Sequence, residues 1–340
     1  MKTFTDLRKE QSWLVVSSLV VIAIFTIGVV LLYARSVLIP FVLAVFISLL
    51  ISPILDYQIL RLKIPRILAV VITLIIVLLI LGVLFLFVSQ AIQSVVSTAG
   101  RYSNSFVNLV KLGLERLKDW GVSPNQEEIV TTLQQRIPGL ITNASGTVFG
   151  FVSDIFLVSI FVIFLLIGRN SRVIRKGIYA DIYGQVCRYV TIKAIVSTVT
   201  GFLVWAVLAL FGLELASVFG ILAFLLNFIP SIGSIVATLL PIPIAVAQFQ
   251  NPWLIALVVS IPGAIQIIIG NGIEPKLMGK GLHLHPVTIL LALSFWGFLW
   301  GIPGMFLAVP MTAVVRIILM QLDTLKPIGN LLAGSLPESK

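Results

Sequence analysis

Long uncharged stretches dominate this chain. Residues 11–34, 36–55, 67–100, 194–213, 215–273 and 281–315 contain no Asp, Glu, Lys or Arg. An α-helix needs about 20 apolar residues to cross the hydrocarbon core of a bilayer. Each stretch is therefore long enough for one crossing, and two of them could hold more than one. The pattern predicts an all-α polytopic membrane protein with about eight hydrophobic segments.

The continuous spans predicted from this pattern cover about 13–33, 37–54, 67–88, 146–168, 194–211 and 253–269. After the third span, apolar residues continue at helical spacings, and Ser123-Pro124 is typical of a helix start. Residues 89–145 are therefore predicted to form a small helical insert outside the membrane. Before the fifth span, apolar residues recur every fourth position from Ile174 to Val190, which predicts an amphipathic helix on the cytoplasmic membrane surface.

Two further apolar regions are interrupted by helix breakers. Region 215–249 is broken at 227–234, and region 286–320 is broken at 301–304, where Pro and Gly residues gather. Each half is short for a full crossing, so a re-entrant hairpin and a pair of short spans both fit. Paired hydrophobic segments interrupted by Gly and Pro indicate the binding region of a transporter.

Composition and charge sharpen this picture. The chain is 59% apolar and 11% charged, against about 25% charged in soluble domains, and its net charge is +10. Most Lys and Arg lie before residue 13, in 55–66, in 168–193, at 276 and 280, and near the C-terminus, which is one side of the membrane if spans alternate. The positive-inside rule then places both termini in the cytoplasm. The net charge reflects topology, and no nucleic-acid partner is predicted.

Several kinds of chemistry are absent from the sequence. The single cysteine, Cys187, excludes a disulfide framework and a cysteine-based metal site. His283 and His285 fit no metal-binding spacing and are interpreted as structural loop residues. No phosphate-binding P-loop sequence and no set of acid, base and nucleophile occurs. We therefore predict neither an enzyme nor a cofactor or metal site.

Parts of the interrupted regions resemble the autoinducer-2 exporter family, a group of bacterial multi-pass permease-like proteins. The matching stretches are 220–223, 227–234, 271–281, 295–297, Gly301 and 304–310, and residues 189–193 before Gly201 are similar to its quorum-signal exporter branch. The resemblance implies an integral inner-membrane protein that exports a small polar signal or a related solute. Some relatives are regarded as sodium or lithium/proton antiporters, and family members are thought to be oligomeric.

The chain is expected to divide at the changes of pattern. We predict an N-terminal bundle of three spans (1–88), the extracytoplasmic insert (89–145), a fourth span with the amphipathic helix (146–193), a C-terminal transport core (194–320) and a cytoplasmic tail (321–340).

The breaks supply most candidate binding residues. Asn227, Pro230, Ser231 and Gly233 in the first break could expose backbone and small polar groups, and so could Gly301 and Gly304 in the second. Irregular backbone at membrane depth is tolerated only inside protein or beside a watery cavity. The alternative is an interfacial turn between two short spans.

The remaining candidates carry charge or lie beside a charge. Glu274, with Asn271 and Pro275 near it, could bind a cation, a proton or a hydroxylated solute, or could pair with a nearby lysine at a helix end. Asp154 fits either a proton relay or an interfacial carboxylate. Lys193 fits membrane anchoring better than solute contact, because long cationic side chains favour helix ends.

These features favour a secondary transporter that exports a small polar metabolite or signal such as autoinducer-2. Regions 215–249 and 286–320 are expected to pack together and enclose the solute, with Asn271 and Glu274 nearby. The alternatives are a sodium(lithium)/proton antiporter, in which Glu274 or Asp154 titrates, and a non-transporting scaffold or sensor whose insert binds a partner. The expected partners are the solute, membrane lipid, a coupling proton or sodium ion, and other copies of the chain.

Overall fold

The computed structural model describes residues 4–83, 155–168, 177–278 and 284–334, together with Leu282 and isolated positions between 85 and 132. Within these residues the regular elements are all helical. Five helices are long and apolar enough to cross a membrane: Arg35–Arg61, Arg66–Phe87, Ala180–Leu210, Pro252–Met278 and Ile302–Gln321. The predicted all-α polytopic fold is thus confirmed. Asp154 and nearly all of the predicted insert 89–145 lie outside the described residues.

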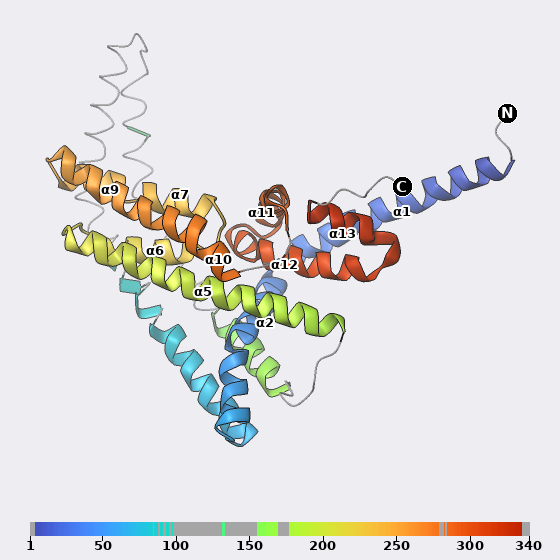
Figure 1. The fold of residues 1–340 in the computed structure, drawn as a ribbon, viewed down its shortest axis with the longest axis horizontal. Helices are drawn as coiled ribbons and strands as arrows, with labels where there is room; N and C mark the ends of the chain where they lie inside the picture. The colour runs from blue at the N-terminus through green and yellow to red at the C-terminus, as the bar shows by residue number, and fades with distance from the viewer. Residues whose placement is uncertain are drawn as a thin grey trace, which may run out of the picture.

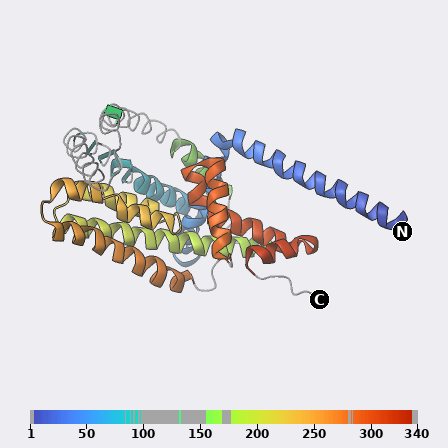
Figure 2. The ribbon, with the colours of Figure 1, turned by 90° about the horizontal axis from the view of Figure 1, so that it is seen from above.

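Among the N-terminal helices, the second follows its predicted span closely, whereas the first begins well before the predicted start at residue 13 and ends at the predicted residue 33. Helix α1 (Phe4–Tyr33) projects away from the rest of the molecule (Figures 1 and 2). Helix α2 (Arg35–Asp56) continues into a short π-helical turn, η1 (Tyr57–Arg61). A buried apolar cluster joins α2 to the helices Arg66–Phe87 and Ile155–Gly168. These helices therefore form one packed group.

Helix α5 (Ile178–Leu210) differs from the expectation. The sequence predicted a surface helix up to about residue 190 and a separate span from 194, but α5 is one helix of 33 residues. It contains no proline, so nothing in its backbone forces a break where the amphipathic pattern gives way to the apolar one. The predicted boundary between 193 and 194 lies inside this helix. At 1.5 Å per residue its length is about 50 Å, which exceeds the roughly 30 Å of the hydrocarbon core.

The first interrupted region forms a hairpin between α5 and α9 (Pro252–Ile267). It consists of α6 (Ala216–Leu226), a turn at 227–231, α7 (Ile232–Leu239) and α8 (Ile242–Gln248). The base is closed because the Gln248 side chain donates to the Gly212 carbonyl at 2.7 Å and accepts from the Glu214 amide at 2.8 Å. Since α6 spans only 11 residues, about 16 Å, its length favours a re-entrant hairpin over two full crossings.

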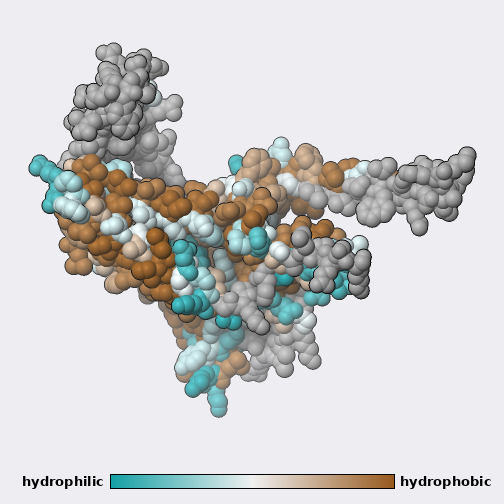
Figure 3. Space-filling model, turned by 45° about the horizontal axis from the view of Figure 1, so that its top comes forward, coloured by the Kyte–Doolittle hydropathy of each residue, from teal (hydrophilic) through white to brown (hydrophobic). Residues whose placement is uncertain are grey.

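Helices α5, α6, α7 and α9 pack around one another as a four-helix bundle, which lies on the left of Figure 2. Its interior is apolar near the hairpin base, where Val204, Leu208, Phe219 and Val258 are buried together. Apolar side chains also cover much of its outer surface (Figure 3). A helix group that is apolar both inside and outside is typical of a membrane-embedded unit.

The second interrupted region also forms a hairpin, made of α11 (Pro286–Trp300) and α12 (Ile302–Gln321). The His285 ring nitrogen accepts from the Val287 amide at 3.3 Å and caps α11, which supports the predicted structural role for this residue. After α12 a short 3-10 turn, η3 (Asp323–Leu325), leads to α13 (Lys326–Leu332). This last helix folds back on α12, where the Arg316 side chain donates to the Gly329 carbonyl at 3.2 Å.

Helix α9 also continues beyond its predicted end near residue 269. A π-helical turn, η2 (Ile268–Ile273), joins it to α10 (Glu274–Met278) without a loop. Gly270 and Gly272 both lie within this helical turn, so neither ends the helix. Glu274 therefore begins a further helical turn rather than a connecting loop.

Candidate functional site

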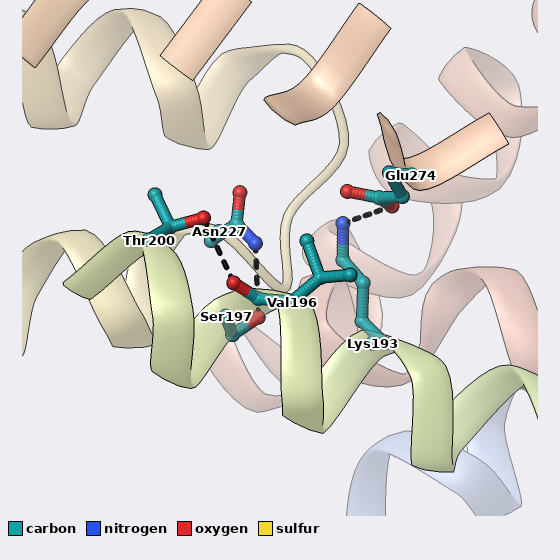
Figure 4. Close-up of polar contacts among 6 residues, drawn as sticks. All are labelled: Lys193, Val196, Ser197, Thr200, Asn227 and Glu274. Carbon is teal, nitrogen blue, oxygen red and sulfur yellow. Dashed lines mark hydrogen bonds and ion pairs between the residues drawn. The ribbon is translucent and has the colours of Figure 1, made fainter. Parts of the chain in front are cut away.

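A buried ion pair joins α5 to α10. The Lys193 ammonium lies 2.5 Å from a Glu274 carboxylate oxygen, and their side chains are only 4% and 14% exposed (Figure 4). Charges are strongly disfavoured inside a membrane protein unless they have a partner. Lys193 lies within α5 rather than at a helix end, and Glu274 pairs with this lysine of another helix rather than with a lysine near it in the sequence.

The π-helical turn brings Glu274 to this position. Along α9 the buried face carries Val258, Pro262 and Gln266 at intervals of four residues, and then Ile269. Glu274 follows Ile269 by five residues, which is the spacing of one π-helical turn. In an uninterrupted α-helix residues three or four apart share a face, so Glu274 would point elsewhere. The extra residue in η2 therefore aligns the carboxylate with the buried face.

A second polar contact lies beside the ion pair. The Asn227 side-chain amide donates to the Ser197 hydroxyl of α5 at 3.0 Å, and the Thr200 hydroxyl donates to the Val196 carbonyl at 2.8 Å (Figure 4). Asn227, Ser197 and Thr200 are almost fully buried. Lys193, Ser197 and Thr200 are spaced by four and three residues, so they form a polar stripe on one face of α5. The first break docks on this stripe through Asn227.

The tip of the first hairpin is a strained γ-turn. Ser231 has φ 61° and ψ −56°, and the Ile232 amide donates to the Pro230 carbonyl at 2.6 Å. This conformation is rare for a residue with a Cβ atom. Pro230 and Ser231 therefore shape the tip, and Ser231 itself is exposed.

Two of the predicted glycines have a packing role. A Cβ atom on Gly233 would lie 1.8 Å from the Leu226 carbonyl oxygen, and one on Gly304 would lie 1.9 Å from the Trp296 carbonyl oxygen. In both hairpins, then, the second helix passes directly over the backbone of the first just after the break. Gly301 has φ 65° and ψ −142°, which suits glycine because it lacks a Cβ atom.

The two hairpins meet at a small cavity. The rings of Phe228 and Phe306 stack with centroids 5.6 Å apart, which joins the first break to α12. Beside them lies a cavity of about 170 Å³. Its walls come from α2, α5, the first break and α12, and they include Tyr189, Lys193 and Pro310. Regions 215–249 and 286–320 thus touch at the tip of the first hairpin, and their enclosing a solute stays a prediction.

The structure brings together only some of the predicted site residues. Lys193, Glu274 and Asn227 lie in one cluster (Figure 4). Asn271 and Pro275 are exposed on the same helical segment as Glu274. Gly301 and Gly304 belong to the second hairpin and supply no side chain to the cluster. Among the residues that the structure describes, no group of His, Cys, Asp and Glu could hold a metal ion.

Sequence reasoning missed two residues of the cluster, two residues of the cavity wall and a buried amide on α9. Ser197 and Thr200 were overlooked, although their spacing from Lys193 within an apolar helix was a usable signal. Gln266 was also missed; it is an uncharged polar residue three positions before the end of the predicted span 253–269. Tyr189 and Phe306 carried no local signal, because aromatic residues are common in membrane helices.

Together, these features define a polytopic α-helical membrane protein whose interrupted hairpins meet at a cavity beside buried polar groups, which is the architecture of a membrane transporter. The family model described as AI-2E family transporter matches residues 19–323. The chain belongs to this family, which is a family of transporters and not of enzymes.

Individual relatives support this assignment. The chain is 30% identical over 301 residues to the AI-2 transport protein TqsA of Escherichia coli, covering 85% of this chain and 87% of the relative. It is 33% identical over 313 residues to a protein of Haemophilus influenzae, covering 84% and 87%. It is also 36% identical over 209 residues to a protein of Borreliella burgdorferi, covering 57% and 58%. The last two are named only as transport proteins, without a substrate.

Proposed function

We propose that this protein is a secondary transporter that exports a small, uncharged polar solute such as autoinducer-2 across the bacterial inner membrane. The observation that carries the proposal is the meeting of the two interrupted hairpins at a small cavity, next to the Lys193–Glu274 pair. The similarity to TqsA, whose name specifies AI-2 transport, supports the choice of solute. Both termini would face the cytoplasm, in line with the charge distribution.

The size and lining of the cavity favour a small solute. Its volume of about 170 Å³ is below the roughly 300–1,000 Å³ of pockets for drug-sized ligands. Lys193 is the charged residue in its wall, and Glu274 already neutralises that charge. A charged solute would have to break this pair, whereas an uncharged one could bind beside it. The apolar walls and few polar groups thus favour a neutral molecule.

The ion pair would also link solute binding to helix movement. Lys193 belongs to α5 and contacts both the cavity and Glu274 of α10, and Asn227 ties the hairpin tip to the same face of α5. A solute that contacts Lys193 or displaces Asn227 would weaken contacts between α5 and its neighbours. Movement of the hairpin relative to α5 would then open the cavity to either side of the membrane in turn.

The test is uptake of labelled autoinducer-2 into proteoliposomes by Lys193→Met, Glu274→Gln and the double variant. Each single change leaves a buried charge without its partner and should cost about 3–5 kcal/mol of stability. The double variant removes both charges, so its Tm should return close to that of the wild type. We expect its transport rate to stay at least tenfold below that of the wild type, because the link between solute and helices is lost.

An exposed ion pair provides the matched control. Lys326 and Asp323 lie 2.5 Å apart on the surface, and Lys326 lowers the pKa of the Asp323 carboxyl through a hydrogen bond and its charge. The double variant Lys326→Met/Asp323→Asn should change neither Tm nor transport appreciably. Full transport by the stable Lys193→Met/Glu274→Gln protein would contradict the proposed role of the buried pair. Failure of the wild type to carry autoinducer-2 would contradict the proposed solute.

Cation/proton antiport is a second candidate, favoured by one observation. Glu274 is a carboxylate on a membrane helix whose partner, Lys193, could be displaced by an arriving cation. The same vesicles, loaded with a pH-sensitive dye, would report proton movement after addition of sodium. Sodium-driven proton movement that disappears in Glu274→Gln, without autoinducer-2 flux, would establish antiport. If folded wild-type protein carries neither autoinducer-2 nor protons, the result would favour the third alternative, a non-transporting scaffold.

A further inference from the structure

Gln266 of α9 is a buried amide without a hydrogen-bond partner. Its residue is only 4% exposed, and both its side-chain nitrogen and its side-chain oxygen lack a partner among the residues that the structure describes. Buried polar groups in folded proteins are nearly always hydrogen-bonded, and each exception calls for an explanation. In a membrane helix the lipid cannot supply the missing bonds. The amide therefore keeps hydrogen-bonding capacity that none of the described residues satisfies.

The position of Gln266 follows from the packing of its helix. Gly263, three residues earlier, faces α7, because a Cβ atom there would lie 3.2 Å from the Thr238 methyl group. Helices α5 and α9 run in opposite directions, and the Lys193–Glu274 pair fixes their register. Gln266 lies eight residues before Glu274, and Thr200 lies seven residues after Lys193. Both are therefore displaced from the ion pair toward the hairpin base by a similar number of residues. Gln266 thus lies within the four-helix bundle, between the ion pair and the apolar core.

The hairpin beside Gln266 packs closely on α5 along α6, where a Cβ atom on Gly220 would lie 2.5 Å from the Trp205 Cβ atom, and makes one polar side-chain contact at its tip. On α5, Asn227 makes a single side-chain hydrogen bond from the tip to Ser197. The tip itself contains the γ-turn at Ser231, a conformation that stores backbone strain. The base, in contrast, is closed by two hydrogen bonds of Gln248. Movement of the tip about this base would open the polar part of the bundle and leave the apolar part packed.

Gln266 does not line the cavity of about 170 Å³ in the present arrangement. We propose that it binds the solute through neighbouring hydroxyl groups once the hairpin tip moves, and so selects neutral polyols over charged metabolites. This inference rests on the proposed transport function. A carboxamide offers one acceptor oxygen and two N–H donors. A hydroxyl group can both donate and accept, so two adjacent hydroxyls satisfy both ends of the amide. A carboxylate can only accept and an ammonium can only donate, so each would satisfy one end.

The variant Gln266→Met separates this role from a structural one. Methionine has a similar length and no polar group, so it removes the unsatisfied amide without leaving a large void. We expect the Tm of the solute-free protein to rise by about 2–4 °C, because no hydrogen bond is lost. The KM for labelled autoinducer-2 in proteoliposomes should rise about 30-fold, the effect of losing two neutral hydrogen bonds. Wild type should also discriminate autoinducer-2 from an analogue lacking one hydroxyl, and the variant should not.

Gln58 is the matched control, because it is also buried but accepts a hydrogen bond from Thr73 at 3.1 Å. Gln58→Met should lower the Tm and leave the KM unchanged. The inference is overturned if Gln266→Met lowers both Tm and transport, which indicates a structural amide. It is also overturned if the Tm rises while KM and discrimination stay the same, which indicates an amide satisfied by water. If the wild type does not transport autoinducer-2, the proposed function is refuted together with this inference. That result is distinct from the two outcomes for Gln266→Met, in which the wild type still transports.

Discussion

At the scale of single residues, Ser231 has a conformation that its side chain disfavours. Its φ of 61° and ψ of −56° define a γ-turn that costs roughly 1–3 kcal/mol when a Cβ atom is present. The strain lies at the hairpin tip, next to Asn227, which makes the buried contact with α5. A strained tip on a closed base is suited to a segment that changes position, because leaving the docked state releases the strain.

Replacing Ser231 by glycine should relieve this strain. Relief of about 1–3 kcal/mol outweighs the roughly 0.5–1 kcal/mol that a glycine loses in backbone entropy on folding. We therefore expect Ser231→Gly to raise the Tm by about 2 °C in a thermal unfolding experiment on purified protein. Ser231→Ala keeps the Cβ atom and serves as the control, with no gain in Tm. A gain of equal size in both variants would show that the hydroxyl group, and not the backbone, is responsible.

At the scale of elements, the decisive feature is the π-helical turn η2 between α9 and α10. The turn inserts one residue into the helix and aligns Glu274 with the buried face that carries Gln266 and Ile269. Insertions of this kind are frequent at functional sites, because they re-aim a side chain without ending the helix. Here the inserted residue decides whether the carboxylate meets Lys193 or lipid.

Deleting Gly272 should therefore abolish the ion pair. With one residue fewer, η2 would return to α-helical geometry and Glu274 would rotate by about 100° around the helix axis. We expect a Tm loss comparable to that of Lys193→Met and a transport rate at least tenfold below wild type. Gly272→Ala is the matched control, because it keeps the register and a Cβ atom there meets nothing within 4 Å. Normal transport by the deletion variant would show that the alignment of Glu274 is unimportant.

At the scale of the whole molecule, the base of the first hairpin and the segment at Leu62 that follows η1 lie toward opposite ends of α5. Gln248 bonds to Gly212, just beyond the C-terminal end of α5. Near the N-terminal end of α5, the Cys187 thiol donates to the Leu49 carbonyl of α2. After Leu49, α2 and η1 lead on to Leu62. If the charge distribution sets the orientation, Leu62 faces the cytoplasm and Gln250 faces outward.

Cysteine labelling in intact cells tests this orientation. In a Cys187→Ala background, Gln250→Cys should react with a membrane-impermeant maleimide added outside. Leu62→Cys should react only after the membrane is permeabilised. Both positions are exposed on the protein surface, so burial would not prevent labelling. The reverse labelling pattern would overturn the prediction that both termini are cytoplasmic.

Much of the fold could be predicted from local chemistry. The spans 37–54 and 67–88 and the segment 286–300 correspond closely to helices in the structure. Their signals are local: an uncharged apolar stretch needs lipid or protein around it, and proline ends or starts a helix because it lacks an N–H group. The continuity of α5 and of α9 through η2 was missed, because glycines and a change of amphipathic pattern permit a break without requiring one.

The candidate site was only partly visible in the sequence. Local chemistry singled out Asn227, Lys193 and Glu274, since polar residues in apolar surroundings stand out along the chain. Lys193 and Glu274 are 81 positions apart, and only the packing of α5 against α10, adjusted by one inserted residue, decides that they meet. Packing also decides that Gln266 is left without a partner. Hydrophobicity and helix breaking act over a few residues and can be read from sequence, whereas the pairing of distant side chains depends on helix register and crossing, which long-range contacts determine.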